Sequence, residues 1–328
     1  MSSHLRKLGL HGPEVSSIAL GCEALSRHAS PEGDAESIAT IHKALEGGVN
    51  LLDTADFYGG GRNELLIGKA IHDRRDAAVL SVKFCGLRSP DGRFVGLDAR
   101  PAAVKNFVTY SLVRMGVDYI DIYRPARLDP TVPIEDTVGA IGDLVKAGYV
   151  RYVGLSEVGP DTIRRAHATH PISDLQIEYS LMSRGPEDEI FPLLRELEIG
   201  VTAYGVLSHG LLSRSARKAP ERAHLPRLQG DNFEHNLQLV SSLSEIAKGK
   251  AVTNSQLAIA WVLAKGWSYV PVVGSKRASQ VEEALSAAQI QLSNEDVRRL
   301  EQAIPPDAVA GARYAEPLMR MLDSEKRR

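Results

Sequence analysis

The sequence contains little cysteine and almost no net charge. Its 328 residues include only two cysteines, Cys22 and Cys85, which are too few for a disulfide framework and favour free thiols in a reducing compartment. The formal net charge of −2 provides neither a basic field for nucleic acids nor a polybasic surface for membranes. The low net charge therefore argues against nucleic acids and membranes as partners and favours a small-molecule partner.

Long hydrophobic runs and linker-like stretches are also missing. The N-terminal segment MSSHLRKLGLHGPEV lacks the apolar core of a signal peptide, and the most apolar run, LAIAWVLAKGWSYVPVVG, is interrupted by Lys265 and by glycines. We therefore expect a cytoplasmic protein. Because no Gly/Ser-rich or Pro-rich segment marks a boundary, residues 1–328 are predicted to form one domain, for which a hydrophobic content of 43% is sufficient.

Apolar runs bounded by turn residues alternate with amphipathic segments along the chain. The expected strands are Ser17–Gly21, Asn50–Ala55, Ala78–Phe84, Tyr119–Arg124, Arg151–Ser156, Leu175–Tyr179, Gly200–Tyr204 and Tyr269–Gly274. The expected helices include Ala35–Glu46, Glu64–Arg74, Pro101–Met115, Ile134–Lys146, Pro160–Thr169 and Glu187–Leu197. This alternation predicts an α/β fold, a (β/α)8 TIM barrel rather than an open doubly wound sheet. Residues 4–16 are expected to form a hairpin that caps the N-terminal mouth, and the residues after Leu292 an extra helix and tail.

Three residues at predicted strand ends could carry chemistry. Asp53 and Lys83 each interrupt an apolar strand, and because isolated buried charges are costly, we expect the two to pair. A purely structural ion pair is the alternative explanation. Tyr58 follows in a loop whose glycines, residues 59–61, would turn its phenol toward the barrel mouth. An ammonium beside this phenol is expected to lower the pKa of Tyr58 and make it a general acid.

Seven motifs along the chain carry a family resemblance. They are LLDTADFYGGGRNELLIGKAI, VKF, SLVRMGVDYIDIY, KAGYVRYVGLSE, LQIEYSLMSR, VPVVGSKRASQVEEAL and RYAEPLMRMLDS. Together they resemble the aldo-keto reductase superfamily over essentially the whole length of the chain. The resemblance implies a (β/α)8 barrel that binds NADPH without a Rossmann domain and reduces an aldehyde or ketone, or oxidises the alcohol, by hydride transfer. It assigns Asp53, Tyr58 and Lys83 to the catalytic tetrad, with Tyr58 as the proton donor.

The resemblance also implies cofactor-binding positions. Gly21, Cys22 and Asp53 approach the nicotinamide end, Ser156 and Gln176 bind the carboxamide, and Tyr204 stacks on the ring. The loop over the pyrophosphate contributes Leu207, Ser208, Gly210 and Leu211. The adenosine half meets Gly274, Ser275, Lys276, Arg277, Gln280 and Glu283. A serine and two cations at a helix start also suit a 2′-phosphate, which favours NADPH over NADH.

Two other cofactor signals are weak. The glycines of GGGRNE do not follow the strand-then-helix GxGxxG pattern of dinucleotide-binding folds. His167 and His170 could share a helix face, but no carboxylate set accompanies them at a strand end, so no metal is expected.

The fourth strand departs from the family pattern. In DYIDIYRPARLDP, residues 118–130, Ala126 stands where the family has the His that orients the substrate carbonyl. We expect Ala126, Arg124 and Arg127 to line the substrate site, with water, Arg124 or the substrate replacing the lost contact. Two functions stay open: a reductase that is slow on unactivated carbonyls, and a cofactor-binding redox sensor or regulatory subunit, as the potassium-channel β-subunits of this family illustrate.

Overall fold

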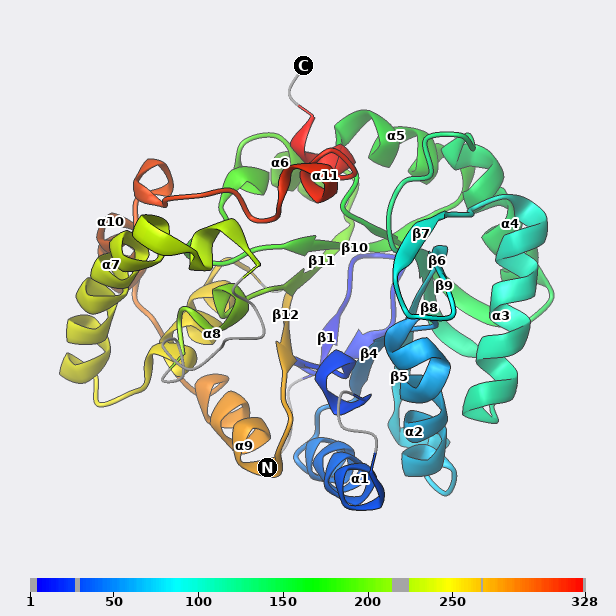
Figure 1. The fold of residues 1–328 in the computed structure, drawn as a ribbon, viewed down its shortest axis with the longest axis horizontal. Helices are drawn as coiled ribbons and strands as arrows, with labels where there is room; N and C mark the ends of the chain where they lie inside the picture. The colour runs from blue at the N-terminus through cyan, green and yellow to red at the C-terminus, as the bar shows by residue number, and fades with distance from the viewer. Residues whose placement is uncertain (1–4, 27–29, 214–223, 267, 327–328) are drawn as a thin grey trace.

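The computed structural model describes residues 5–26, 30–213, 224–266 and 268–326, and its central feature is a closed barrel of eight strands (Figure 1). The barrel strands are β3 (Ala19–Gly21), β4 (Leu51–Ala55), β5 (Val79–Phe84), β8 (Ile120–Pro125), β9 (Val150–Ser156), β10 (Ile172–Glu178), β11 (Gly200–Tyr204) and β12 (Tyr269–Gly274). All neighbouring strands are parallel, and β12 pairs with β3 to close the sheet. The predicted (β/α)8 barrel is confirmed.

Helices surround this barrel (Figure 1). They are α1 (Pro31–Glu46), α2 (Arg62–Ile71), α3 (Pro101–Met115), α4 (Ile134–Lys146), α5 (Pro160–Thr169), α6 (Ile190–Glu196), α7 (Gly230–Gly249), α8 (Asn254–Ala264), α9 (Ala278–Ala287), α10 (Asn294–Ala303) and α11 (Glu316–Met319). Local sequence explains several ends. The Ser30 side chain accepts a hydrogen bond from the Gly33 N–H at the start of α1, and Gly116 ends α3 in the left-handed region at φ 65°. Within the described residues no helix is both long and apolar enough to cross a membrane.

A hairpin closes the N-terminal mouth of the barrel, as predicted. Strands β1 (Arg6–Lys7) and β2 (Glu14–Val15) pair antiparallel, while residue 4 of the expected hairpin lies outside the described residues. Leu8 and Val15 are fully buried and pack with a cluster of barrel residues that includes Leu51 and Ile122. Burial of these side chains fixes the hairpin across the end of the barrel opposite the predicted site.

The barrel interior holds a buried ion pair that corrects one expectation. Arg124 on β8 is fully buried, and its Nη1 lies 2.7 Å from an Asp174 carboxylate oxygen on β10. It also donates to the Thr202 hydroxyl at 3.1 Å and to the Ser81 hydroxyl at 3.0 Å. A buried guanidinium needs such partners, because it would otherwise carry a large desolvation cost. The prediction that Arg124 lines the substrate site was therefore wrong, since its side chain has no exposed surface.

Two further segments lie at the carboxyl ends of the strands. Strands β6 (Gly86–Arg88) and β7 (Phe94–Leu97) form a hairpin after β5, in a segment that is not among the expected strands. After α10, the tail returns over the barrel, where α11 lies close to α5 (Figure 1). An Asp323 carboxylate oxygen accepts hydrogen bonds from the Gly159 N–H at 2.9 Å and the Thr162 hydroxyl at 2.7 Å, which anchors the tail at the start of α5.

Candidate active site

A buried ion pair joins the ends of β4 and β5. The Lys83 Nζ lies 2.6 Å from an Asp53 carboxylate oxygen, and each side chain is 7% exposed. The other Asp53 oxygen accepts hydrogen bonds from the Ser81 hydroxyl at 3.1 Å and the Gln176 amide at 2.7 Å. Burial lowers the pKa of Lys83, although Asp53 opposes this change. The pairing that was expected of these two charges is present.

The turn after β4 places Tyr58 next to this pair. Gly59, Gly60 and Gly61 take the left-handed conformation at φ 57°, 63° and 90°, so the chain reverses within a few residues. The Lys83 Nζ lies 5.1 Å from the centre of the half-buried Tyr58 ring. Burial and the Asp53 charge raise the pKa of Tyr58 well above its ordinary value. The prediction that the pKa of Tyr58 is lowered was therefore wrong, and the phenol keeps its proton at neutral pH.

The residues expected around a nicotinamide converge on the same rim. Gly21 pairs in register with Asp53, and the Cys22 N–H donates to the Asp53 carbonyl at 2.9 Å. Burial raises the pKa of the Cys22 thiol, which makes it an unreactive apolar side chain. The buried Ser156 hydroxyl, at the end of β9, has no hydrogen-bond partner among the described residues. Such an orphaned group is suited to a ligand.

Tyr204 and the loop after it border this rim. The Tyr204 hydroxyl donates to a Glu157 carboxylate oxygen at 2.6 Å. In the loop, the buried Ser208 hydroxyl lies 2.9 Å from the Ser180 hydroxyl, and Leu211 is buried in the core. The N–H groups of Ser208, Gly210 and Leu211 bond to carbonyls within the turn, while Leu207 and Gly210 stay partly exposed. These three N–H groups are already bonded, so a pyrophosphate bound here would contact the partly exposed surfaces of Leu207 and Gly210 instead.

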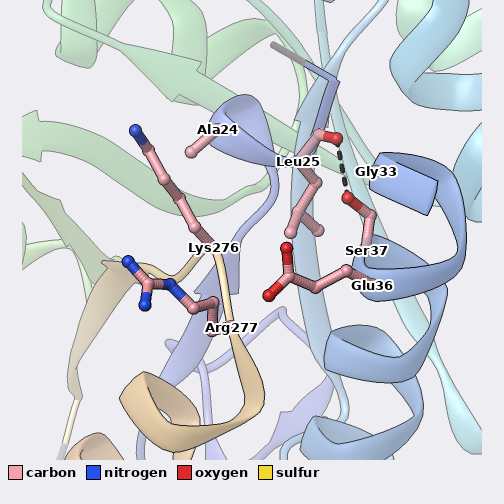
Figure 2. A pocket seen from close by; sticks show the side chains of 7 residues that line it. All are labelled: Ala24, Leu25, Gly33, Glu36, Ser37, Lys276 and Arg277. Carbon is pink, nitrogen blue, oxygen red and sulfur yellow. Dashed lines mark hydrogen bonds between the residues drawn. The ribbon is translucent and has the colours of Figure 1, made fainter. Parts of the chain in front are cut away.

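A cavity of about 450 Å³ lies beside the start of α9 (Figure 2). Its lining residues are Ala24, Leu25, Gly33, Glu36, Ser37, Lys276 and Arg277. Figure 2 shows Lys276 and Arg277 on one side and Glu36 and Ser37 of α1 on the other. The two cations give this side of the cavity a positive character that suits a phosphate.

The other residues expected at the adenosine end make contacts within the protein. The Gln280 side-chain oxygen accepts a hydrogen bond from the Lys276 N–H at 2.7 Å, which braces the chain before α9. The Glu283 carboxylate accepts from the Thr253 hydroxyl at 2.6 Å, at the start of α8. Ser275 is buried and Gly274 is exposed. Lys276 and Arg277 are thus the members of this set that line the cavity.

The end of β8 places Ala126 at the rim. Its N–H donates to the Phe84 carbonyl at 2.9 Å, and its side chain is buried. Arg127 is half-buried and donates to the Ala126 carbonyl at 2.6 Å. Although burial alone would lower the pKa of Arg127, the neighbouring Tyr204 and Glu157 raise it. The Arg127 cation is therefore close enough to Tyr204 and Glu157 for both to stabilise its charge.

A buried charge cluster at this rim was missed from the sequence. Arg313, on the tail, bridges Glu157, which follows β9, and Glu178, which ends β10. Burial alone would raise the pKa of Glu178, but His209 and Arg313 hold it at about 2. The position of both glutamates at strand ends is the signal that identified Asp53 and Lys83, and it could have identified them too. No described group of three or more His, Cys, Asp or Glu side chains could hold a metal ion.

The sequence of the chain matches a known family. Residues 17–305 match the family model described as the aldo/keto reductase family. The chain belongs to this family. A probable aldo-keto reductase 1 from Glycine max is 39% identical over 315 residues, which cover 94% of this chain and 91% of that protein.

Solved aldo-keto reductase structures share the fold over nearly the whole chain. A glycerol dehydrogenase from Gluconobacter oxydans is 25% identical with a TM-score of 0.84, covering 100% of this chain and 98% of that one. An aldo-keto reductase from Klebsiella pneumoniae in complex with NADPH is 25% identical with a TM-score of 0.76, covering 93% and 96%. These similarities support oxidoreductase activity on carbonyl compounds for this member of the family.

Proposed function

We propose that this aldo-keto reductase is an NADPH-dependent enzyme that interconverts ketones or aldehydes and alcohols, with Tyr58 as the proton donor. The observation that carries the proposal is the half-buried Tyr58 phenol beside the Lys83–Asp53 ion pair, with 5.1 Å between Nζ and the ring centre. A neutral phenol and a fixed cation at one rim are suited to protonating and stabilising a developing alkoxide.

The residues of the rim and of the cavity fit NADPH. The orphaned Ser156 hydroxyl and the Gln176 amide would hold the carboxamide, and Tyr204 would lie against the ring. Lys276 and Arg277 would hold the 2′-phosphate that NADH lacks. When bound, the dihydronicotinamide supplies a hydride. The Klebsiella pneumoniae relative was solved with NADPH, which supports this choice of cofactor.

Each catalytic residue has a separate role in this proposal. Tyr58 donates its proton to the carbonyl oxygen as negative charge develops there. Lys83 stabilises that charge, and Asp53 fixes the ammonium through the 2.6 Å contact. Ala126 stands in place of the orienting His and donates nothing, so turnover of unactivated carbonyls should be slow. Ala126 and Arg127 remain the proposed substrate contacts, without Arg124.

NADPH oxidation against a panel of ketones and aldehydes tests this function. We expect Tyr58→Phe to lower kcat by roughly a hundredfold or more, because it removes the general acid. NADPH binding, followed by fluorescence, should stay unchanged in this variant. Equal rates for the two proteins would overturn the mechanism. Tight NADPH binding by the wild-type protein without turnover of any panel member would instead favour the cofactor-binding sensor.

A further inference from the structure

The C-terminal tail inserts a cation into the catalytic mouth. Arg313 is 6% exposed, and its guanidinium donates to both carboxylate oxygens of Glu157, at 3.1 and 3.0 Å, and to Glu178 at 3.1 Å. A third carboxylate, on Glu325 of the same tail, accepts from Arg313 at 2.7 Å. Both strand-end glutamates are buried, and this bridge connects the tail to β9 and β10.

Glu157 links the bridge to the proposed nicotinamide site. It directly follows Ser156, and its carboxylate accepts hydrogen bonds from the Tyr204 hydroxyl and the Ser324 hydroxyl, both at 2.6 Å. Its backbone has φ 52°, a left-handed conformation that is uncommon for residues other than glycine. The surrounding contacts therefore hold Glu157 in this conformation, and it in turn holds the Tyr204 hydroxyl.

Neighbouring cations keep the Glu157 carboxylate ionised. Burial alone would raise the pKa of Glu157, but Arg313 and then Arg127 hold it below its ordinary value. The titratable and charged groups around the bridge are Arg127, Glu178, Tyr204, His209, Arg227, Tyr314 and Glu325. Among them, Arg313 is the cation bonded to both buried glutamates, so its loss would leave a carboxylate uncompensated at the rim.

We propose that Arg313 is a positioning residue, which neutralises Glu157, thereby fixes Tyr204, and sets the charge beside the nicotinamide ring. This inference rests on the proposed function, because it requires the ring to lie against Tyr204. The tail is then part of the cofactor site, although Arg313 lies 156 residues after Glu157 in the sequence. Its contribution is electrostatic, so it should distinguish the two redox states of the cofactor.

The oxidised nicotinamide ring carries a positive charge that the reduced ring lacks. Replacing Arg313 with Met leaves the Glu157 carboxylate without its main counter-charge and should favour NADP⁺ over NADPH. At an effective dielectric constant near 20, a unit charge about 12 Å from the ring changes such a ratio by roughly tenfold. Glu157→Gln removes the negative charge instead and should move the ratio in the opposite direction.

The experiment compares dissociation constants for NADPH and NADP⁺, by fluorescence titration and by competition, in the full-length protein. We expect R313M to shift the ratio about tenfold toward NADP⁺, and R313K, which keeps the charge, to restore most of the wild-type ratio. R320M is the matched control, because Arg320 is a cation of the same tail that pairs, among the described residues, with the exposed Glu316. It should leave the ratio unchanged.

The outcomes separate this inference from the proposed function. An unchanged ratio in folded R313M, or an equal shift in R320M, would overturn the inference while the enzyme could still be an NADPH-dependent reductase. If R313M does not fold, the E157Q variant provides the test. A ratio of NADPH and NADP⁺ dissociation constants that does not shift in favour of NADPH in E157Q would then overturn the inference. Failure of the wild-type protein to bind NADPH would overturn the proposed function and the inference with it.

Discussion

The Lys83 ammonium and the Asp53 carboxylate meet at 2.6 Å inside the barrel mouth, with each side chain 7% exposed. The two charges come from neighbouring strands, since β4 pairs with β5 in parallel register. Gln176 and Ser81 satisfy the second Asp53 oxygen, so the pair has few unmet hydrogen bonds. A pair of this kind is costly to break, because the remaining charge stays buried.

Lys83→Met should destabilise the fold, since it leaves Asp53 as a buried carboxylate without its counter-charge. We expect the free energy of unfolding in urea to fall by about 3 to 5 kcal/mol. The double variant with Asp53→Asn should recover part of this loss. Arg164→Met is the control, because its partner Glu196 and Arg164 itself are 58% and 53% exposed, and it should cost less than about 1 kcal/mol. Equal losses in both single variants would contradict this prediction.

Asp56 should make stability fall as pH rises. Its side chain is 6% exposed, neither carboxylate oxygen has a partner among the described residues, and burial together with Glu64 raises its pKa to about 8. The unfolded chain has the ordinary value near 3.9. Between these two pKa values the folded state keeps a proton on Asp56 that the unfolded state releases. The contribution of this proton to the free energy of unfolding is therefore fully present below about pH 4 and is lost as pH rises to about 8.

Asp56→Asn tests this dependence. The stability of the variant relative to the wild type should rise between pH 4 and 8, on the order of 3 to 5 kcal/mol in total. Urea unfolding at several pH values measures the difference. Glu64 and Arg114 are present in both proteins, so their titration largely cancels. A difference that is the same at pH 4 and pH 8 would show that Asp56 ionises normally.

Strand-helix alternation predicted the barrel because each strand is a short apolar run with its own turn signals. Charges at strand ends predicted the Asp53–Lys83 pair, since parallel strands bring their carboxyl ends to one rim. The same reasoning misplaced Arg124. An arginine near a strand end can point into the barrel or over its rim, and only the contact with Asp174 shows that it points inward.

Arg313 illustrates what sequence patterns do not contain. It lies in the tail, far from the strands in sequence, and no periodic pattern relates residue 313 to Glu157 or Glu178. The contact depends on the path of the tail over the barrel, which Asp323 anchors at the start of α5. The direction of the Tyr58 pKa shift was predicted wrongly for a similar reason. The burial of Tyr58 and its distance from Asp53 are set by tertiary structure.

Carbonyl reduction should be insensitive to the ionisation of Tyr58 over the neutral range. Burial and Asp53 raise the pKa of Tyr58 well above 10, so the proton-donating form persists as pH rises. We expect kcat for reduction to stay constant from about pH 6 to 9. Steady-state kinetics with NADPH measures the profile. A fall in kcat near neutral pH that is absent from the residual activity of Tyr58→Phe would contradict this assignment.

Arg277 should set the preference for NADPH over NADH. With Lys276 it lines the cavity next to α9, and a charge-assisted bond to a phosphate contributes about 1.5 to 3 kcal/mol. Arg277→Met should therefore weaken NADPH binding by at least about tenfold and leave NADH binding unchanged. Arg298→Met, which removes an exposed cation from α10, is the control and should change neither constant. A parallel loss of both cofactors would indicate a structural role for Arg277.

Ala126→His should speed the reduction of a simple aldehyde. The side chain of Ala126 lies at the rim formed by β5 and β8, where its N–H bonds to the Phe84 carbonyl. An imidazole there would be able to donate to the carbonyl oxygen, and a single preorganised donor of this kind changes rates by roughly a hundredfold. Ala126→Leu adds comparable bulk without a donor and should not increase kcat. If both variants gain equally, the improvement comes from packing, and if neither gains, the substrate oxygen lies away from residue 126.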